Sequence, residues 1–292
     1  MQAFTYERPT SVEAAIEMMS STGARALAGG TDLIPQLRER RRSARSVVDL
    51  KHVPELTAIQ RLDDGAWRIG AATSIQRMAA VPALRRDYPG LIEAAQLIGS
   101  LQLQSRASLG GNLANGAPSA DAVPLLISLG AVAEIAGPAG RRSLAVAQIP
   151  EGPGRSSLGP GELIVALLLP ARPQRSAARY LRFTPRREMD IAIAGAGVAL
   201  ELGAGGEVVK ARITLASVGP VPIQAEEAAN ELIGKRPDET LLAKAAKAAA
   251  TEARPISDTR GSADYRRELV AVLTRRALEA CAAEAAAWGD GR

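Results

Sequence analysis

Two glycine pairs constrain this 292-residue chain more than any other feature of its sequence. The first pair is in the stretch ALAGGTDL, Ala26 to Leu33, and the second is in SLGGNLANGAPSADAVPLL, Ser108 to Leu126. Each pair separates an apolar segment from a segment with helical periodicity, so the chain has to turn there. A glycine can adopt positive φ at such a corner and lets a ligand approach bare backbone.

Short apolar runs alternate with amphipathic segments along the chain, which predicts an α+β fold. Changes in composition and a Pro/Arg-rich linker over 170–180 divide the chain into three parts. Residues 1–55 form a small α/β unit, residues 56–175 a larger α+β unit, and residues 176–292 a C-terminal α+β domain.

Local signals predict the main elements within these parts. Ser11 is the expected N-cap of the first helix, and Asp64-Gly65 marks the turn of a hairpin. The further elements expected from periodicity are a long helix over 90–103, a helix over 122–131, strands near 132–148 and 162–170, a hairpin over 190–219, and two Ala-rich helices near 238–253 and 264–287.

The rare residue types exclude several functions. Cys281 is the single cysteine and His52 the single histidine. The chain alone therefore cannot form an intramolecular disulfide, a Cys-ligated zinc site, a multi-histidine metal site or an iron–sulfur cluster. Cys281 lies near an apolar helical stripe, which indicates a small core residue. A nucleophilic role for Ser108 fails because no Gly-x-Ser-x-Gly motif surrounds it.

The charge pattern indicates no nucleic-acid partner. The net charge is only +5, acids and bases alternate along most of the chain, and aromatic residues make up 3%. The densest basic run, Arg38 to Arg45, has two interpretations: a solvated helix end or a docking patch for an acidic partner. No signal region and no apolar run of about 18 residues occurs, so a cytoplasmic protein is expected.

The two glycine corners suit a diphosphate. Successive amide N–H groups at a corner point into one concavity, and the following helix adds its positive end. In this hypothesis a side chain at Gly30 or Gly110 would fill the space of the phosphates and leave the fold largely intact. The alternative, for either corner alone, is that the glycines merely turn the chain.

Short polar side chains follow the second corner. Asn112, Asn115, Ser119 and Asp121 could bind a polyhydroxyl chain such as ribitol beside the diphosphate. Asp32 is a carboxylate beside the supposed anion site, so it is expected either to cap the following helix or to face a hydroxyl group or water.

These corners identify a family. The first corner, ALAGGTDL, and the stretch SRASLGGNLANGAPSADAVPLLISLGA together strongly resemble sequences of the FAD-binding medium subunits of the molybdenum hydroxylases. This family includes xanthine and carbon monoxide dehydrogenases. The resemblance continues in order through YLRFTPRREMDIAIAGAGVAL, ASVGPVPIQAEEAANELIGK and PISDTRGSADYRRELVAVLTRRAL. It implies a two-subdomain FAD-binding domain of the molybdopterin dehydrogenase (vanillyl-alcohol-oxidase-like) type, followed by a C-terminal α+β domain.

The resemblance also implies residue roles. It places Asp121 at the ribityl chain, Leu163 and Ile164 at the flavin or adenine, and Arg182, a lysine in many relatives, near the isoalloxazine. Both corners wrap the diphosphate of FAD, through Leu27, Ala28, Gly29, Gly30, Thr31, Asp32 and Leu33, and through Ser108, Leu109, Gly110, Gly111 and Asn112.

Three arginines are candidates for tuning the flavin ring: Arg182, Arg186 and Arg187. A nearby cation stabilises a reduced, anionic flavin. The alternative for this cluster is a solvated loop that pairs with Glu188 or Asp190.

The function that the resemblance implies is electron transfer. Electrons from a molybdopterin-type molybdenum cofactor on a large subunit pass through two-iron iron–sulfur clusters on a small subunit to this FAD, and then to an external acceptor. The implied assembly is a dimer of heterotrimers, and this chain itself binds no metal. Two alternatives stay open: a self-sufficient FAD oxidoreductase with its own substrate site, and a flavin-free docking scaffold.

Overall fold

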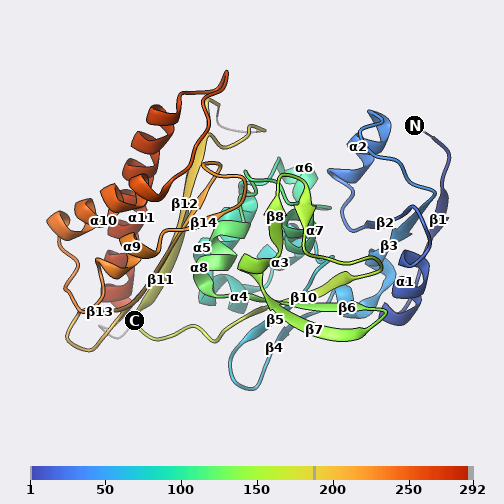
Figure 1. The fold of residues 1–292 in the computed structure, drawn as a ribbon. Helices are drawn as coiled ribbons and strands as arrows, with labels where there is room; N and C mark the ends of the chain where they lie inside the picture. The colour runs from blue at the N-terminus through green and yellow to red at the C-terminus, as the bar shows by residue number, and fades with distance from the viewer. Residues whose placement is uncertain (1, 187–188, 289–292) are drawn as a thin grey trace.

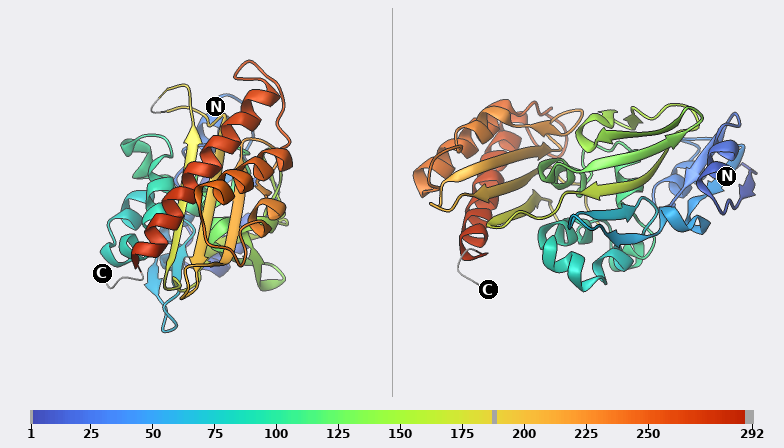
Figure 2. Two further views of the ribbon diagram at one scale, coloured as in Figure 1. Left: turned by 90° about the vertical axis from the view of Figure 1, so that its left-hand side faces the viewer. Right: turned by 90° about the horizontal axis from the view of Figure 1, so that it is seen from below.

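The computed structural model describes residues 2–186 and 189–288, which form three sheet-containing parts that lie in a row (Figures 1 and 2). The N-terminal part holds a parallel three-stranded sheet, the middle part an antiparallel five-stranded sheet, and the C-terminal part an antiparallel four-stranded sheet. The α+β class expected from the sequence is confirmed. Among the helices described, none combines the length and hydropathy that a membrane crossing requires.

The N-terminal sheet has the strand order β1-β3-β2. Its neighbours are parallel, so helices connect the strands and cover the sheet. Ser11 caps α1 as expected, because its Oγ accepts a hydrogen bond from the Ala14 amide at 3.1 Å. The elements of this part are β1 (Thr5–Glu7), α1 (Val12–Met19), β2 (Ala24–Leu27), α2 (Leu33–Arg38) and β3 (Ser46–Asp49).

The middle sheet has the order β4-β5-β10-β6-β7 and carries its helices on one side. Its central strand, β10 (Leu163–Leu169), is buried almost throughout, as a central strand with two neighbours requires. The other strands are β4 (Ile59–Arg61), β5 (Trp67–Gly70), β6 (Val132–Gly137) and β7 (Gly140–Ala145), and β8 (Pro150–Gly152) and β9 (Arg155–Ser156) form a separate hairpin.

The helices of the middle part are short. The helix predicted over 90–103 is wrong as one element: α5 ends at Gln96, and Gly99 takes a φ of +62° before α6 begins. Left-handed backbone cannot continue an α-helix. The helical elements are η1 (Leu50–His52), η2 (Pro54–Leu56), α3 (Ile75–Ala79), α4 (Pro82–Asp87), α5 (Pro89–Gln96), α6 (Leu101–Gln104), α7 (Leu109–Ala114), α8 (Val123–Leu129) and η3 (Val146–Gln148).

The C-terminal sheet has the order β11-β12-β13-β14, with α11 packed on β11 and β12. The linker predicted over 170–180 is shorter in the structure, because β11 already begins at Ser176. Cys281 is a fully buried core residue of α11, as expected. The elements are β11 (Ser176–Phe183), β12 (Ala194–Leu202), β13 (Val208–Ala216), β14 (Ile223–Gln224), α9 (Glu226–Asn230), α10 (Glu239–Glu252) and α11 (Ala263–Trp288).

Candidate functional site

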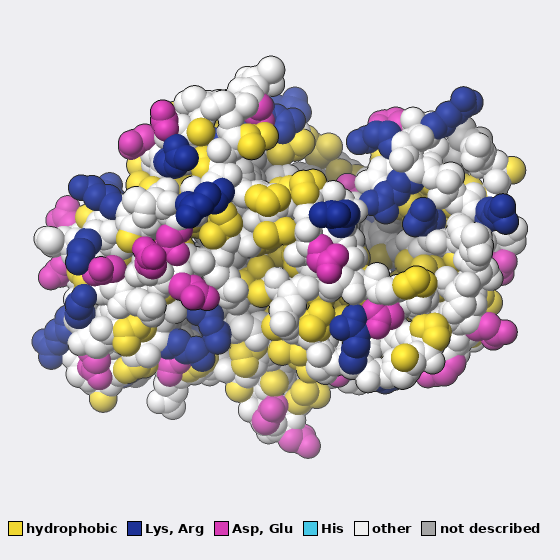
Figure 3. All heavy atoms as spheres, viewed as in Figure 1, with side chains coloured by type: hydrophobic (Ala, Val, Ile, Leu, Met, Phe, Trp, Pro, Cys, Tyr) yellow, Lys and Arg dark blue, Asp and Glu magenta, His cyan; other side chains and the backbone are white. Residues whose placement is uncertain are grey.

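A cavity of about 260 Å³ lies between the N-terminal and middle parts. The surface is hollowed there, between the N-terminal part on the right of Figure 3 and the rest of the molecule. The β2–α2 corner forms one wall, α7 a second, and the start of β10 a third. Of the predicted residues, those that line the cavity are Ala28, Gly29, Gly30, Thr31, Asp32, Leu33, Ser108, Gly110, Gly111, Asn112, Asn115, Leu163 and Ile164.

The first corner presents a row of unbonded backbone donors to this cavity. Within the described part of the chain, the amides of residues 29–33 have no hydrogen-bond partner. Gly30 turns the chain with a φ of +77°, which a residue with a side chain rarely adopts. Amide groups of this kind are satisfied by water or by an anion, so the corner is suited to phosphate oxygens.

A partly buried ion pair supports this corner. Lys51 donates from Nζ to the Ala28 carbonyl at 2.7 Å and to the Asp49 carboxylate, which also accepts from the Tyr6 hydroxyl. Burial favours the neutral form of Asp49. The hydrogen bonds from Lys51 and Tyr6 outweigh that effect and keep the pKa of Asp49 below its ordinary value. Lys51 is not among the residues predicted from the sequence, because no local pattern connects it to Ala28, 23 residues earlier.

The second corner differs from the prediction. Gly110 and Gly111 lie inside α7 in helical conformation, and the Gly111 amide is already capped by Ser108 Oγ at 3.1 Å. A Cβ on Gly110 would lie 2.5 Å from the carbonyl oxygen of Ala71, so this glycine serves backbone packing. The expectation that a side chain at Gly110 leaves the fold intact is therefore wrong.

Gly111 is the glycine of α7 that faces the cavity. An added Cβ there would meet only Ser108 Oγ at 3.1 Å and the Ala28 Cβ at 3.8 Å. Gly29, by contrast, is required for packing, because its Cβ would lie 2.2 Å from the Arg106 carbonyl oxygen. The four glycines of the two corners thus have different physical roles.

Polar side chains complete the cavity. Asn112 Oδ1 is buried and has no hydrogen-bond partner within the described residues, so it is free to accept a hydrogen bond from a ligand. Gln36 Nε2 donates to Asn115 Oδ1 at 3.4 Å and so links α2 to α7. Asp32 occupies the N-cap position of α2, but its side chain makes no capping bond, so of the two alternatives for Asp32 the capping one is wrong.

Two arginines supply positive charge in the cavity wall. Arg42 donates to the Gly154 carbonyl at 3.3 Å, and Arg25 donates to the Ser43 carbonyl at 3.2 Å. Arg42 belongs to the basic run, so one member of that run faces the cavity, which neither interpretation of the run anticipated. Leu27 and Leu109, which were expected in the site, are buried in the hydrophobic cores instead.

Asp121 and Arg182 do not line the cavity. They pair with each other at 2.5 Å, and both side chains are buried. Tyr180 donates its hydroxyl to the second oxygen of Asp121 at 3.2 Å. Burial raises the pKa of Asp121 to about 6, and the bonds to Arg182 and Tyr180 offset only part of that effect. Asp121 is thus engaged by protein groups, and the ribityl contact that the resemblance implies for it stays a prediction.

The arginines predicted to lie near the flavin ring have different surroundings. Arg186 is exposed, donates to the Met189 carbonyl at 2.6 Å and lies 3.7 Å from Asp190. For Arg186 these contacts match the alternative of a solvated loop that pairs with Asp190. Arg187, like Glu188, lies outside the described residues. Of the two members that the structure describes, Arg182 is the buried cation and Arg186 is exposed.

The geometry of the cleft defines a class of protein. A cleft between two α+β units, with a row of unbonded amides, two cations and apolar walls, fits an elongated phosphate-containing cofactor. Residues 2–172 match the family model described as the FAD binding domain in molybdopterin dehydrogenase, and residues 179–281 match the CO dehydrogenase flavoprotein C-terminal domain. The chain belongs to the family of FAD-binding medium subunits of the molybdenum hydroxylases, as the sequence predicted.

Individual relatives cover almost the whole chain. The carbon monoxide dehydrogenase medium chain of Afipia carboxidovorans is 35% identical over 97% of this chain and 98% of its own length. A putative xanthine dehydrogenase FAD-binding subunit of Escherichia coli is 29% identical over 96% and 97%. The crystal structure of the Cu,Mo-CO dehydrogenase matches with a TM-score of 0.92 at 34% identity, over 97% of this chain and 99% of that one.

These comparisons confirm the family, the fold type and the class of activity. The chain is an FAD-dependent oxidoreductase subunit, and its relatives are named as medium chains or FAD subunits of enzymes with several subunits. The unbonded amides, the orphaned Asn112 Oδ1 and the space before Gly111 show that the residues present fit FAD.

Proposed function

We propose that this chain transfers electrons as the FAD subunit of a molybdenum-dependent hydroxylase complex. A large subunit with a molybdopterin-type molybdenum cofactor oxidises the substrate, a small subunit with two-iron iron–sulfur clusters delivers the electrons, and an external acceptor removes them from FAD. The assembly in this proposal is a dimer of heterotrimers in the cytoplasm. The relatives named as medium chains of such dehydrogenases support it.

The observation that carries the proposal is the row of unbonded amides at residues 29–33. Five consecutive donors facing a cavity form a site for diphosphate oxygens. The cations Arg25 and Arg42 lie in the same wall and offset the negative charge of the diphosphate.

We assign Asn112, Leu163 and Ile164 by their position in the cleft, and Arg182 and Asp121 by their buried pairing outside its wall. Asn112 Oδ1 accepts from a hydroxyl group of the cofactor, and Leu163 and Ile164 exclude water from its rings. Arg182 is the buried cation that influences the flavin ring, and Asp121 positions Arg182 rather than the ribityl chain. Bound FAD supplies hydride and one-electron exchange, while these residues bind and orient it.

We also propose 1–55, 56–175 and 176–292 as the domain boundaries. Each of the three larger sheets is formed within one of these ranges, since no strand of one sheet pairs with a strand of another in the described residues. The two family models meet between residues 172 and 179, close to the second boundary.

The test compares the full chain with its co-purified complex. We expect the chain alone to bind FAD reversibly and to reduce artificial dyes, but to oxidise no aldehyde, purine, N-heterocycle or carbon monoxide. The complex should oxidise one of these. Turnover of substrate by the chain alone would favour the self-sufficient oxidoreductase, and a colourless chain that does not bind added FAD would favour the docking scaffold.

A further inference from the structure

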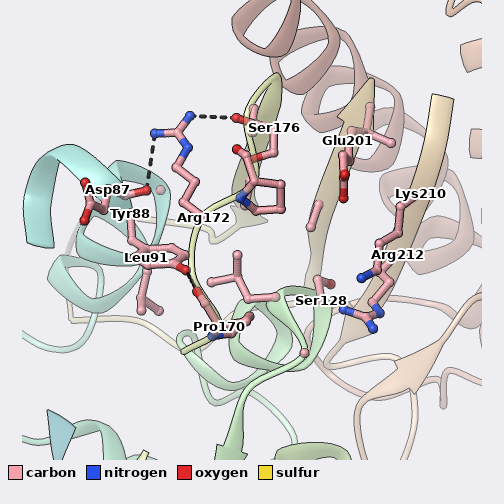
Figure 4. A pocket seen from close by; sticks show the side chains of 18 of the residues that line it. Asp87, Tyr88, Leu91, Ser128, Pro170, Arg172, Ser176, Glu201, Lys210 and Arg212 are labelled. Atoms are coloured by element: carbon pink, nitrogen blue, oxygen red, sulfur yellow. Dashed lines mark hydrogen bonds between the residues drawn. The ribbon is translucent and has the colours of Figure 1, made fainter. Parts of the chain in front are cut away.

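A second cavity, of about 340 Å³, lies between the middle and C-terminal parts (Figure 4). The α4–α5 junction, the end of α8, the segment over 170–178, and β12 and β13 enclose it, and no residue of its wall belongs to the flavin cleft. Its volume is within the range of about 300–1,000 Å³ that small-molecule sites occupy.

Most of the wall is apolar, and the acidic groups on one side are already neutralised. Glu284 pairs with Arg172 at 3.2 Å and with Arg179 at 2.6 Å, and Asp87 lies 3.6 Å from the guanidinium of Arg61. Figure 4 shows that Arg172 donates hydrogen bonds to two backbone carbonyl groups, those of Asp87 and Ser176. The apolar wall residues are Leu91, Leu129, Pro170, Pro173, Ala177 and Leu200.

The opposite side presents positive charge. Lys210 and Arg212 are two residues apart on β13, so they lie on the same face of the strand, and Figure 4 shows both on the cavity wall beside Ser128. Within the described residues, neither makes an ion pair or a side-chain hydrogen bond. Glu201 is the cross-strand neighbour of Lys210 and is likewise unpaired, which leaves one net positive charge.

Arg212 packs against the backbone at the end of α8. A Cβ on Gly130 would lie 2.5 Å from Arg212 Nη1, so the guanidinium packs directly against a residue that has no side chain. The negative end of α8 stabilises the cation there without occupying its remaining donors.

We propose that this cavity binds a small organic anion, with an aromatic or aliphatic body on the apolar wall and a carboxylate-type group between Lys210 and Arg212. An anion there offsets the repulsion between two neighbouring cations. Because the wall comes from both the middle and the C-terminal parts, the bound anion also links them.

The test uses isothermal titration of the FAD-loaded full chain with 2-naphthoate, and with neutral 2-naphthalenemethanol for comparison. We expect one 2-naphthoate site, with the neutral analogue at least about tenfold weaker. Lys210→Gln and Arg212→Gln should each weaken naphthoate binding at least about fivefold, and the double variant should abolish it. Lys247→Gln, which removes an exposed cation of α10, is the matched control and should bind normally.

Three results would overturn the proposal: no naphthoate binding by the unmodified chain, equal binding by the neutral analogue, or equal binding by the double variant. Thermal melts of each variant show whether it is folded. FAD stays saturating throughout, so binding in the flavin cleft does not contribute, and the outcome is independent of the proposed function.

Discussion

At the residue scale, the four corner glycines show that one residue type has three physical roles. Gly30 is required for its positive φ and Gly29 and Gly110 for close backbone contact, whereas Gly111 lines the cavity, where an added methyl group would meet Ser108 Oγ and the Ala28 Cβ. The dipeptide Gly-Gly looks the same in each corner, but the neighbours that a side chain would meet differ.

The adjacent glycines of α7 allow a direct comparison. We expect Gly111→Ala to lower the affinity for FAD several-fold with stability unchanged or raised by up to about 1 kcal/mol, because the new methyl group enters the cavity and alanine favours helix. Gly110→Ala should instead destabilise the fold by roughly 1–3 kcal/mol, because the Ala71 backbone cannot move away. Flavin fluorescence titration and urea unfolding measure the two effects. Equal behaviour of the two variants would contradict the assignment.

At the element scale, α8 joins the middle part to the C-terminal sheet. Asp121, just before the helix, pairs with Arg182 of β11, and Ser128 in its last turn donates to the Gly197 carbonyl at 2.9 Å. The helix is therefore attached to the sheet near both ends, by an ion pair at one and a buried hydroxyl at the other.

The pair at the start of α8 gives stability a specific pH dependence. The pKa of Asp121 is about 6 in the folded chain and 3.8 ordinarily, so folding favours its protonated form, and the stability it contributes is lost as pH rises from about 4 to about 6. We compare the free energy of unfolding of the unmodified chain with that of Asp121→Asn. The value for the unmodified chain minus the value for the variant should be larger at pH 5 than at pH 7, by roughly 1 kcal/mol.

Urea unfolding at the two pH values measures this difference. Asp63→Asn, which removes an exposed carboxylate from the β4–β5 turn, is the control. A difference that stays constant, or that shifts in favour of Asp121→Asn at pH 5, would show that the pKa of Asp121 is not raised.

At the scale of the whole molecule, the N-terminal part depends on its neighbour. Its own apolar cluster is small, and Val12, Ala15 and Val48 pack in a core that includes Leu163 and Val165 of β10. A three-stranded sheet of this size is only marginally stable alone. A ligand in the cleft contacts both parts, so binding should stabilise the N-terminal part most.

Hydrogen exchange measures this coupling. We expect saturating FAD, at about 100 times its dissociation constant, to raise the stability by about 2.7 kcal/mol and to slow exchange most in peptides covering residues 24–50. Peptides from α10 are the internal control and should change little. Uniform protection along the chain, or none over 24–50, would contradict the location of the cofactor.

The sequence alone determined the elements with strong local signals. Ser11 at the start of α1, the Asp64-Gly65 turn, the buried run of β10 and the helix before Gly130 all depend on neighbours within a few residues, so local pattern was sufficient. The same is true of the family, since its motifs are contiguous stretches.

Only the tertiary structure decided which residues face the cleft. The roles of Gly110 and Gly111, the support of Ala28 by Lys51, and the pairing of Asp121 with Arg182 depend on contacts between segments 23 to 83 residues apart. Local sequence specifies φ and periodicity, but burial and hydrogen-bond partners are set by packing between distant segments. For that physical reason the corners could be found from the sequence, and the surroundings of their side chains and amides could not.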